Sequence, residues 1–270
     1  LDPNKLSDDG TVALAGISFS KDAKYMAYQV SRSGSDWREI YVMEVESRKK
    51  LDDKIEWVKF SGTSWERDGF YYSRYDESKG EDEFKGANTF QKVYYHSVGT
   101  PQAEDYLVYK DDEHPERGFG VQVTEDERFL ILSAWESTSG NTLAIKDLRK
   151  KEGEFVSIID NFDSEQYVVD NEGGRFLVQT NLDAPNQRLV EFDIENPAVE
   201  NWKDLIPETQ DVLSAGTAGG QIFATYMQDA RSVVKQFDMQ GKLVKEIELP
   251  GIGSANGFGG NKDDKVVFYT

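Results

Sequence analysis

The chain has 270 residues and no cysteine, and its 31 basic and 50 acidic side chains give a formal net charge of −19. This acidity argues against a nucleic-acid partner, because binding to phosphates needs a basic face. The absence of cysteine excludes disulfides, thiolate nucleophiles and cysteine metal sites. The absence of cysteine is compatible with the cytosol, which we favour, and with the periplasm.

A membrane-spanning segment is not expected, because no stretch approaches 18 consecutive apolar residues. The first residue is Leu1 rather than Met, and the last residues lie in a strand-like run. We therefore interpret both ends as cuts in a longer protein.

A short aromatic or β-branched run returns six times along the chain, each time after an acidic or glycine-containing turn. Its markers are Tyr25, Phe70, Phe129, Phe176, Ile222 and Val266. Successive markers lie 45, 59, 47, 46 and 44 residues apart. A period of about 40–50 residues with four short strands per unit is typical of a β-propeller blade.

Within each period the strand signals recur in the same order. The first unit predicts strands over residues 12–20, 25–31, 39–45 and 53–60. The second predicts strands over 63–65, 70–74, 92–98 and 106–110. The third predicts strands over 120–124, 129–135, 142–147 and 155–159. The fourth predicts strands over 167–170, 176–180, 188–193 and 202–206. The fifth predicts strands over 212–215, 222–227, 232–238 and 243–249.

Partial units are predicted at both ends. A sixth unit begins at Ile252 and stops after its second strand, and residues 1–6 could complete a preceding blade. Residues 76–88 are a charged, glycine-bearing insertion, which we expect to be a mobile surface loop. Residues 147–154 would place charges on every face of a helix, so we interpret them as a loop.

A β-sandwich is the competing interpretation, since sandwich strands also return every 8–12 residues or so. Sandwiches do not, however, repeat a four-strand pattern with its turns six times. We therefore predict an all-β propeller of about five complete four-stranded blades with partial blades at both ends.

Candidate catalytic or metal-binding residues are scarce. His96 occupies the alternating polar position of a predicted strand, and His114 precedes Pro115 in an acidic loop. Because a zinc site needs three or four suitable ligands, we predict no metal site and no cofactor. A Gly-x-Ser-x-Gly nucleophile elbow is absent, and residues 253–257 have the wrong spacing. The acidic runs at 7–10, 111–113 and 263–264 fit strand-joining turns better than calcium loops.

Seven segments spread in collinear order along the chain are more specific. They are LDPNKLSDDGTVAL at 1–14, SGSDW at 33–37, WVKFS at 57–61, VYYHSVGT at 93–100, IIDNF at 158–162, NEG at 171–173 and PNQRL at 185–189. In these segments the chain resembles the propeller of the prolyl oligopeptidase family of serine peptidases.

The resemblance implies a two-domain parent, in which a seven-bladed propeller caps an α/β-hydrolase domain with a Ser-Asp-His triad. That parent cleaves short peptides after proline, and its propeller restricts entry to oligopeptides. The chain would then be one truncated propeller domain over residues 1–270, inert without the hydrolase domain. Its expected partners are its own C-terminal α/β-hydrolase domain and proline-containing oligopeptides. Entry through the central tunnel and entry by domain separation both stay open.

Truncation of the ring has a further expected consequence. It would leave two open sheet edges, and unpaired edges invite association with a second copy. We therefore expect some self-association, or a ring closed again with fewer blades.

The resemblance also implies three substrate-binding residues. The family supplies an aromatic pocket residue from the Val-Lys-Phe-Ser segment, which is Phe60 here, although a Phe at the end of a strand is usually a core residue. A second apolar pocket residue follows Pro115, and Phe119 is the nearest candidate. Animal members of the family place an arginine near the end of the strand that holds Leu132 and Ser133. This chain has no arginine there, and Trp135 could offer apolar surface instead.

Two other functional classes stay open. A non-catalytic interaction propeller is the first alternative, although the Gly-His and Trp-Asp pairs of WD repeats are missing. A self-contained propeller hydrolase or lyase is the second, and it would need a convergent acid/base set in the tunnel.

Overall fold

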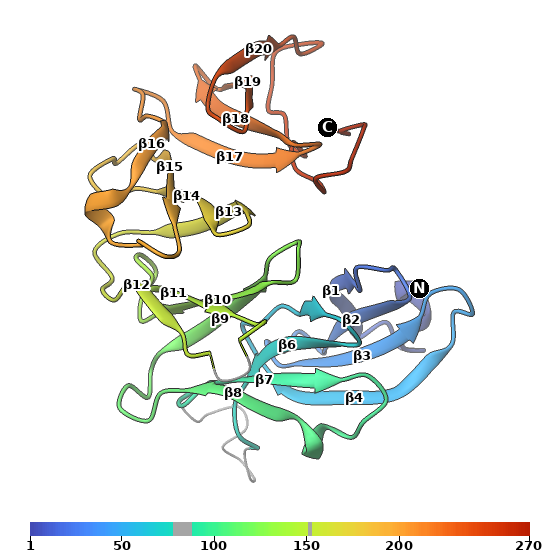
Figure 1. Ribbon diagram of the computed structural model, residues 1–270. Helices are drawn as coiled ribbons and strands as arrows, with labels where there is room; N and C mark the ends of the chain where they lie inside the picture. The colour runs from blue at the N-terminus through green and yellow to red at the C-terminus, as the bar shows by residue number, and fades with distance from the viewer. Residues whose placement is uncertain (78–87, 151–152) are drawn as a thin grey trace. The chain divides into compact units, whose positions relative to one another are not determined.

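The structure, a computed structural model, describes residues 1–77, 88–150 and 153–270. These residues form five four-stranded sheets (Figure 1). In each sheet the strands are neighbours in chain order. Such an antiparallel meander is the blade unit of a β-propeller. The predicted all-β class and four-strand unit are therefore confirmed, whereas the number of blades in the ring stays a prediction.

The first and second sheets span residues 12–110. The first contains β1 (Val12–Phe19), β2 (Tyr25–Arg32), β3 (Arg38–Glu44) and β4 (Lys50–Val58). The second contains β5 (Ser64–Glu66), β6 (Gly69–Arg74), β7 (Lys92–Ser97) and β8 (Tyr106–Lys110).

The other three sheets follow in chain order. The third contains β9 (Gly118–Val123), β10 (Phe129–Trp135), β11 (Leu143–Asp147) and β12 (Val156–Ile159). The fourth contains β13 (Gln166–Glu172), β14 (Arg175–Thr180), β15 (Arg188–Asp193) and β16 (Lys203–Ile206). The fifth contains β17 (Leu213–Ala218), β18 (Gln221–Gln228), β19 (Arg231–Asp238) and β20 (Leu243–Ile247). Short 3-10 turns lie at η1 (Pro3–Lys5), η3 (Gln102–Glu104) and η4 (Val199–Asn201).

The chain divides into two compact units, one of residues 1–138 with 144–155 and the other of residues 139–143 with 156–270. In the first unit, the first two sheets pack face to face. Side chains alternate across a strand, so Ile40 and Val42 of β3 share one face and Tyr41 lies on the other. The shared core of these two sheets consists of Ala27, Ile40, Val42, Ile55, Val58, Trp65, Phe70 and Tyr72.

The second unit has its own core between the fourth and fifth sheets. Its members are Leu177, Leu189, Ile206, Leu213, Ile222, Ala224, Tyr226 and Met239. Because successive side chains of a strand point to opposite faces, Ile222, Ala224 and Tyr226 of β18 share the face that points into this core.

The C-terminal segment differs from the prediction, because residues 252–270 contain no strand. Phe258 instead packs between Phe223, at 5.9 Å between ring centroids, and Tyr269, at 4.9 Å. Asn256 and Thr270 exchange backbone hydrogen bonds of 2.9 and 3.0 Å. Backbone hydrogen bonds to the fifth sheet hold the segment as well, from the Gly260 N–H to the Thr217 carbonyl and from the Gly219 N–H to the Asn261 carbonyl, each at 2.9 Å. These contacts are too scattered to form the continuous ladder of a strand.

Two predicted loops fall partly outside the described residues. Of the insertion at 76–88, only 76, 77 and 88 are described, and of the charged segment at 147–154, residues 151 and 152 are not. Within the described ranges, no helix is both long and apolar enough to cross a membrane.

Candidate functional site

An aromatic cluster forms where the first and second sheets end together. Trp37 comes from the β2–β3 turn, Trp57 from the end of β4, and Tyr75 directly follows β6. Trp37 meets Trp57 edge-on at 5.7 Å between ring centroids and Tyr75 at 5.9 Å. The Tyr75 N–H donates a 3.0 Å hydrogen bond to the Trp57 carbonyl, which fixes the two strand ends together. We call Trp37, Trp57 and Tyr75 the tryptophan cluster.

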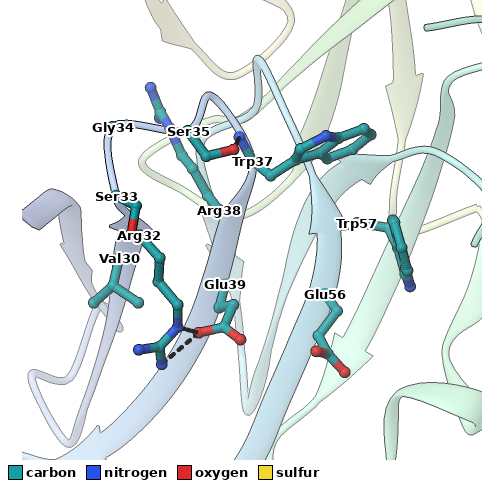
Figure 2. Close-up of a pocket in the computed structure, with 10 residues that line it drawn as sticks. All are labelled: Val30, Arg32, Ser33, Gly34, Ser35, Trp37, Arg38, Glu39, Glu56 and Trp57. Atoms are coloured by element: carbon teal, nitrogen blue, oxygen red, sulfur yellow. Dashed lines mark hydrogen bonds and ion pairs between the residues drawn. The ribbon is translucent and has the colours of Figure 1, made fainter. Parts of the chain in front are cut away.

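The tryptophan cluster borders a pocket of about 480 Å³ in the first sheet (Figure 2). Figure 2 shows Arg32 and Glu39 facing each other on the neighbouring strands β2 and β3, with the Trp37 and Trp57 rings on the other side of the view. The lining residues are Val30, Arg32, Ser33, Gly34, Ser35, Trp37, Arg38, Glu39, Glu56 and Trp57. The pocket therefore combines an aromatic wall with a charged wall.

The side chains of the charged wall form ion pairs with one another. Glu39 pairs with Arg32 at 2.8 Å and with Lys54 at 3.1 Å, and Lys54 also reaches Glu56 at 2.6 Å. Burial alone would raise the pKa of Glu39, but hydrogen bonds from Lys54, Tyr41 and Arg32 bring it below its ordinary value. Glu39 is thus an ionised partner in a network rather than a proton donor.

Phe60 lies two residues beyond the end of β4, next to the tryptophan cluster. Its side chain is 54% exposed, and its backbone has a positive φ of 55°. The Lys59 ammonium lies 5.2 Å from the Phe60 ring centroid and 5.4 Å from the Trp37 ring centroid. It also lies 3.6 Å from Asp36. Phe60 is therefore an exposed aromatic beside the pocket rather than a core residue, and its role in substrate binding stays a prediction.

Phe119 lies in the core instead of in a pocket. It is 1% exposed, in β9, within a cluster that includes Val93, Leu132 and Ala134. Its ring meets that of Tyr109 at 5.2 Å. Alternation along β9 turns this side chain inward, and its role in substrate binding stays a prediction.

Trp135 is the last residue of β10 and covers glycines of the neighbouring strand. It is partly exposed and paired in register with Gly118. A Cβ built on Gly118 would lie 2.4 Å from the indole, and one on Gly120 would lie 3.3 Å from it. Trp135 thus offers some apolar surface, but it lies outside the lining of the pocket beside Phe60.

The structure therefore does not bring Phe60, Phe119 and Trp135 into one site. It places Trp37 near Phe60, because the Lys59 ammonium lies within 5.4 Å of both ring centroids, and Trp37 in turn meets Trp57. The sequence did not single these two tryptophans out. Both lie in segments that carry the family resemblance, at 33–37 and 57–61. The missing signal was backbone conformation, since the positive φ of 63° at Trp57 cannot be read from residue types.

A separate polar cluster surrounds His96, whose side chain is fully buried. Its Nδ1 lies 2.7 Å from Asp105 Oδ1 and its Nε2 lies 3.0 Å from Asp53 Oδ1. Burial alone would lower the pKa of His96, but the hydrogen bonds with Asp105 and Asp53 raise it to about 9. Among the described residues, no group of three or more His, Cys, Asp or Glu side chains is arranged to hold a metal ion.

Comparison with known proteins gives one consistent result. The family described as prolyl oligopeptidase, N-terminal β-propeller domain, matches residues 1–270. A prolyl endopeptidase of Elizabethkingia meningoseptica is 48% identical over 100% of this chain and 38% of its own length. Prolyl oligopeptidase A of Amanita bisporigera is 39% identical over 77% of this chain and 30% of its own length.

Solved structures agree with these relatives. A structure from a study of two prolyl endopeptidases superposes with a TM-score of 0.90, at 33% identity, over 100% of this chain and 38% of that one. Prolyl oligopeptidase B from Galerina marginata, bound to a 25mer macrocyclization substrate, superposes with a TM-score of 0.91, at 28% identity, over 99% of this chain and 39% of that one. The chain thus spans two-fifths or less of the length of the relatives it matches. The chain belongs to the family of prolyl oligopeptidase N-terminal β-propeller domains.

Proposed function

We propose that this chain is the propeller part of a proline-specific serine oligopeptidase and that it acts by lining the substrate pocket and restricting access to it. The observation that carries this proposal is the 48% identity to a prolyl endopeptidase over the whole chain. On this proposal, a C-terminal α/β-hydrolase domain, which the family resemblance implies, supplies the nucleophile. The chain itself would be inactive.

Two features of the first unit support a pocket-lining role. Phe60 exposes about half of its ring, and the tryptophan cluster places further aromatic surface at the same end of the sheets. Aromatic faces suit prolyl rings and other apolar peptide side chains, because they bury area without needing hydrogen bonds. The proposed ligand is therefore an extended, proline-containing oligopeptide.

The gating role follows from the architecture of the family. A hydrolase pocket with an open mouth would attack loops on folded proteins, whereas a propeller over that pocket admits only narrow chains. Substrate entry through the tunnel and entry by separation of the two domains are both compatible with this role.

The decisive experiment compares the chain alone with the chain joined to its natural C-terminal continuation. We expect no cleavage of a succinyl-Gly-Pro reporter by the chain alone and full cleavage by the joined protein. A folded protein with proline-containing loops should resist the joined protein, whereas synthetic oligopeptides with the sequences of those loops should be cut. A continuation without a Gly-x-Ser-x-Gly elbow would refute the proposal and favour a non-catalytic interaction propeller.

We also propose that the isolated chain self-associates through open sheet edges, and exposed apolar side chains favour this association. The fifth sheet and the segment after it carry Leu243, Val244, Ile252 and Phe268, each at least half exposed. Light scattering over a range of concentrations tests this proposal. A monomer at every concentration would contradict it.

A further inference from the structure

The turn that carries Phe60 is held by a buried amide from the next sheet. Gln91 directly precedes β7 and is fully buried. Its Nε2 donates a 2.8 Å hydrogen bond to the Lys59 carbonyl. Its Oε1 accepts a 2.6 Å hydrogen bond from the Phe119 N–H. One side chain thus links the turn after β4 to the first strand of the third sheet.

The other side of the turn is fixed as well. Gln29 donates from Nε2 to the Ser61 carbonyl at 3.1 Å. Ser61 Oγ accepts a 2.7 Å hydrogen bond from the Ser73 N–H. The backbone is therefore held on both sides of Phe60, while the Phe60 ring itself is half exposed. The position of the ring is set chiefly by its backbone.

That backbone has an unfavourable conformation. Trp57 and Phe60 have φ angles of 63° and 55°, in the left-handed region that a Cβ disfavours. Such residues persist only where the surrounding structure fixes them. The hydrogen bond from Gln91 to the residue before Phe60 is one of the contacts that can do so.

We propose that Gln91 is a positioning residue for Phe60. It holds the Lys59 carbonyl so that Phe60 keeps its left-handed conformation and presents its ring to the peptide. Loss of the amide leaves the Lys59 carbonyl and the Phe119 N–H buried without this partner, and the turn relaxes to satisfy them. This inference rests on the proposed function, because it takes Phe60 as a peptide contact.

The fourth sheet offers a matched control. Gln179 of β14 makes the same kind of bridge, donating from Nε2 to the Leu213 carbonyl at 3.3 Å and accepting at Oε1 from the Ala215 N–H at 2.7 Å. It belongs to the second unit, whereas Phe60 belongs to the first. Gln179→Leu therefore removes a similar amide bridge, whose partners are Leu213 and Ala215 rather than residues of the Phe60 turn.

The test is a double-mutant cycle on the full-length peptidase, with kcat and KM measured for a proline-containing oligopeptide. We expect Phe60→Ala and Gln91→Leu each to raise KM by about tenfold with kcat unchanged, as for lost uniform binding. The double variant should show no further rise, because both changes remove the same contact. Gln179→Leu should leave KM unchanged. If Gln91→Leu does not fold, Gln91→Met keeps the length of the side chain, removes the donor to the Lys59 carbonyl, and should raise KM in the same way.

Two results separate failure of this inference from failure of the proposed function. If Phe60→Ala raises KM but the folded Gln91 variant does not, or if the two effects multiply in the double variant, the positioning role is wrong and the pocket role of Phe60 survives. If Phe60→Ala leaves KM unchanged, the pocket role itself is wrong, and the positioning role is overturned with it.

Discussion

His96 and Asp105 share a 2.7 Å hydrogen bond between Nδ1 and Oδ1, and neither side chain is exposed to solvent. Asp53 lies 3.0 Å from Nε2 on the other side of the ring, also with no exposed side-chain surface. The Tyr72 hydroxyl donates to the second oxygen of Asp105 at 2.6 Å, and burial raises the pKa of Tyr72, so it stays neutral. The Gly99 N–H donates to Asp53 at 2.6 Å. An imidazolium held between two carboxylates therefore ties β4 of the first sheet to the second sheet.

The stability of the protein should depend on the protonation of His96. Its pKa rises from 6.5 to about 9 on folding, because the hydrogen bonds with Asp105 and Asp53 outweigh the effect of burial. A raised pKa in the folded state means that the stabilisation is complete below pH 6.5 and is lost as pH rises through about 9. We expect the free energy of unfolding to fall by about 3 kcal/mol over this range. Urea unfolding at a series of pH values measures it.

At low pH the free energy of unfolding should change in the opposite direction, falling as pH falls. Burial alone would raise the pKa of Asp53, but hydrogen bonds from His96 and Gly99 bring it below 3.8. Its contribution to the free energy of unfolding is present above pH 3.8 and is lost as pH falls.

His96→Gln should remove the fall in the free energy of unfolding at alkaline pH. His114→Gln, which changes a half-exposed side chain, is the control and should keep that fall. An alkaline slope that persists in His96→Gln would contradict the assignment.

Asp105→Asn should lower the pKa of His96. It replaces one of the two carboxylates that hold the imidazolium with a neutral amide of the same shape. The pKa should move from about 9 toward the ordinary value of 6.5. An NMR titration of the His96 ring reports it directly. Asp111→Asn, beside the exposed His114, is the matched control and should leave the His96 titration unchanged.

Gly118→Ala should destabilise the third sheet through Trp135. The new Cβ would lie 2.4 Å from the indole, so the ring must move while Phe119 next to it stays in the core. Overpacking of this kind costs about 1–3 kcal/mol of unfolding free energy. Gly120→Ala, at 3.3 Å from the same ring, should cost less. Thermal unfolding of the two variants compares them, and equal losses would show that the indole is not the obstacle.

The repeat structure of the fold is readable from the sequence, because each blade is a local meander. Turn residues and two-residue alternation recur with each unit, and the five complete units appear as five sheets. The final segment is the exception. The run at 265–269 has the composition of a strand but forms none, because strand formation depends on partners that local pattern does not report.

The candidate site was less predictable for the same reason. Phe60 and Phe119 are both phenylalanines near strand ends, yet one is 54% exposed and the other 1% exposed. The difference depends on a left-handed backbone at Phe60 and on the alternation of β9, which begins one residue before Phe119. Likewise, the buried environment of His96 joins residues 53, 96 and 105, and only the packing of two sheets brings these positions together.

Phe60→Ala should weaken peptide binding without weakening the fold. The ring is half exposed, and the Lys59 ammonium lies 5.2 Å from its centroid, so its removal should change the unfolding free energy by no more than about 0.5 kcal/mol. In the peptidase formed with the hydrolase domain, KM for prolyl oligopeptides should rise, and Phe60→Tyr should keep most of the affinity because it keeps the ring.

The matched control for this prediction is Tyr106→Ala. Tyr106 is 70% exposed and is the first residue of β8, where it pairs with Tyr95 of β7. At the opposite end of the same β7–β8 ladder Lys92, which directly follows Gln91, pairs with Lys110. Tyr106 therefore lies at the end of the second sheet away from the Phe60 turn, which Gln91 contacts through Lys59. Removal of an exposed aromatic there should leave KM unchanged. Equal rises in KM for Phe60→Ala and Tyr106→Ala would mean that general surface hydrophobicity, rather than a site at the Phe60 end, governs peptide affinity.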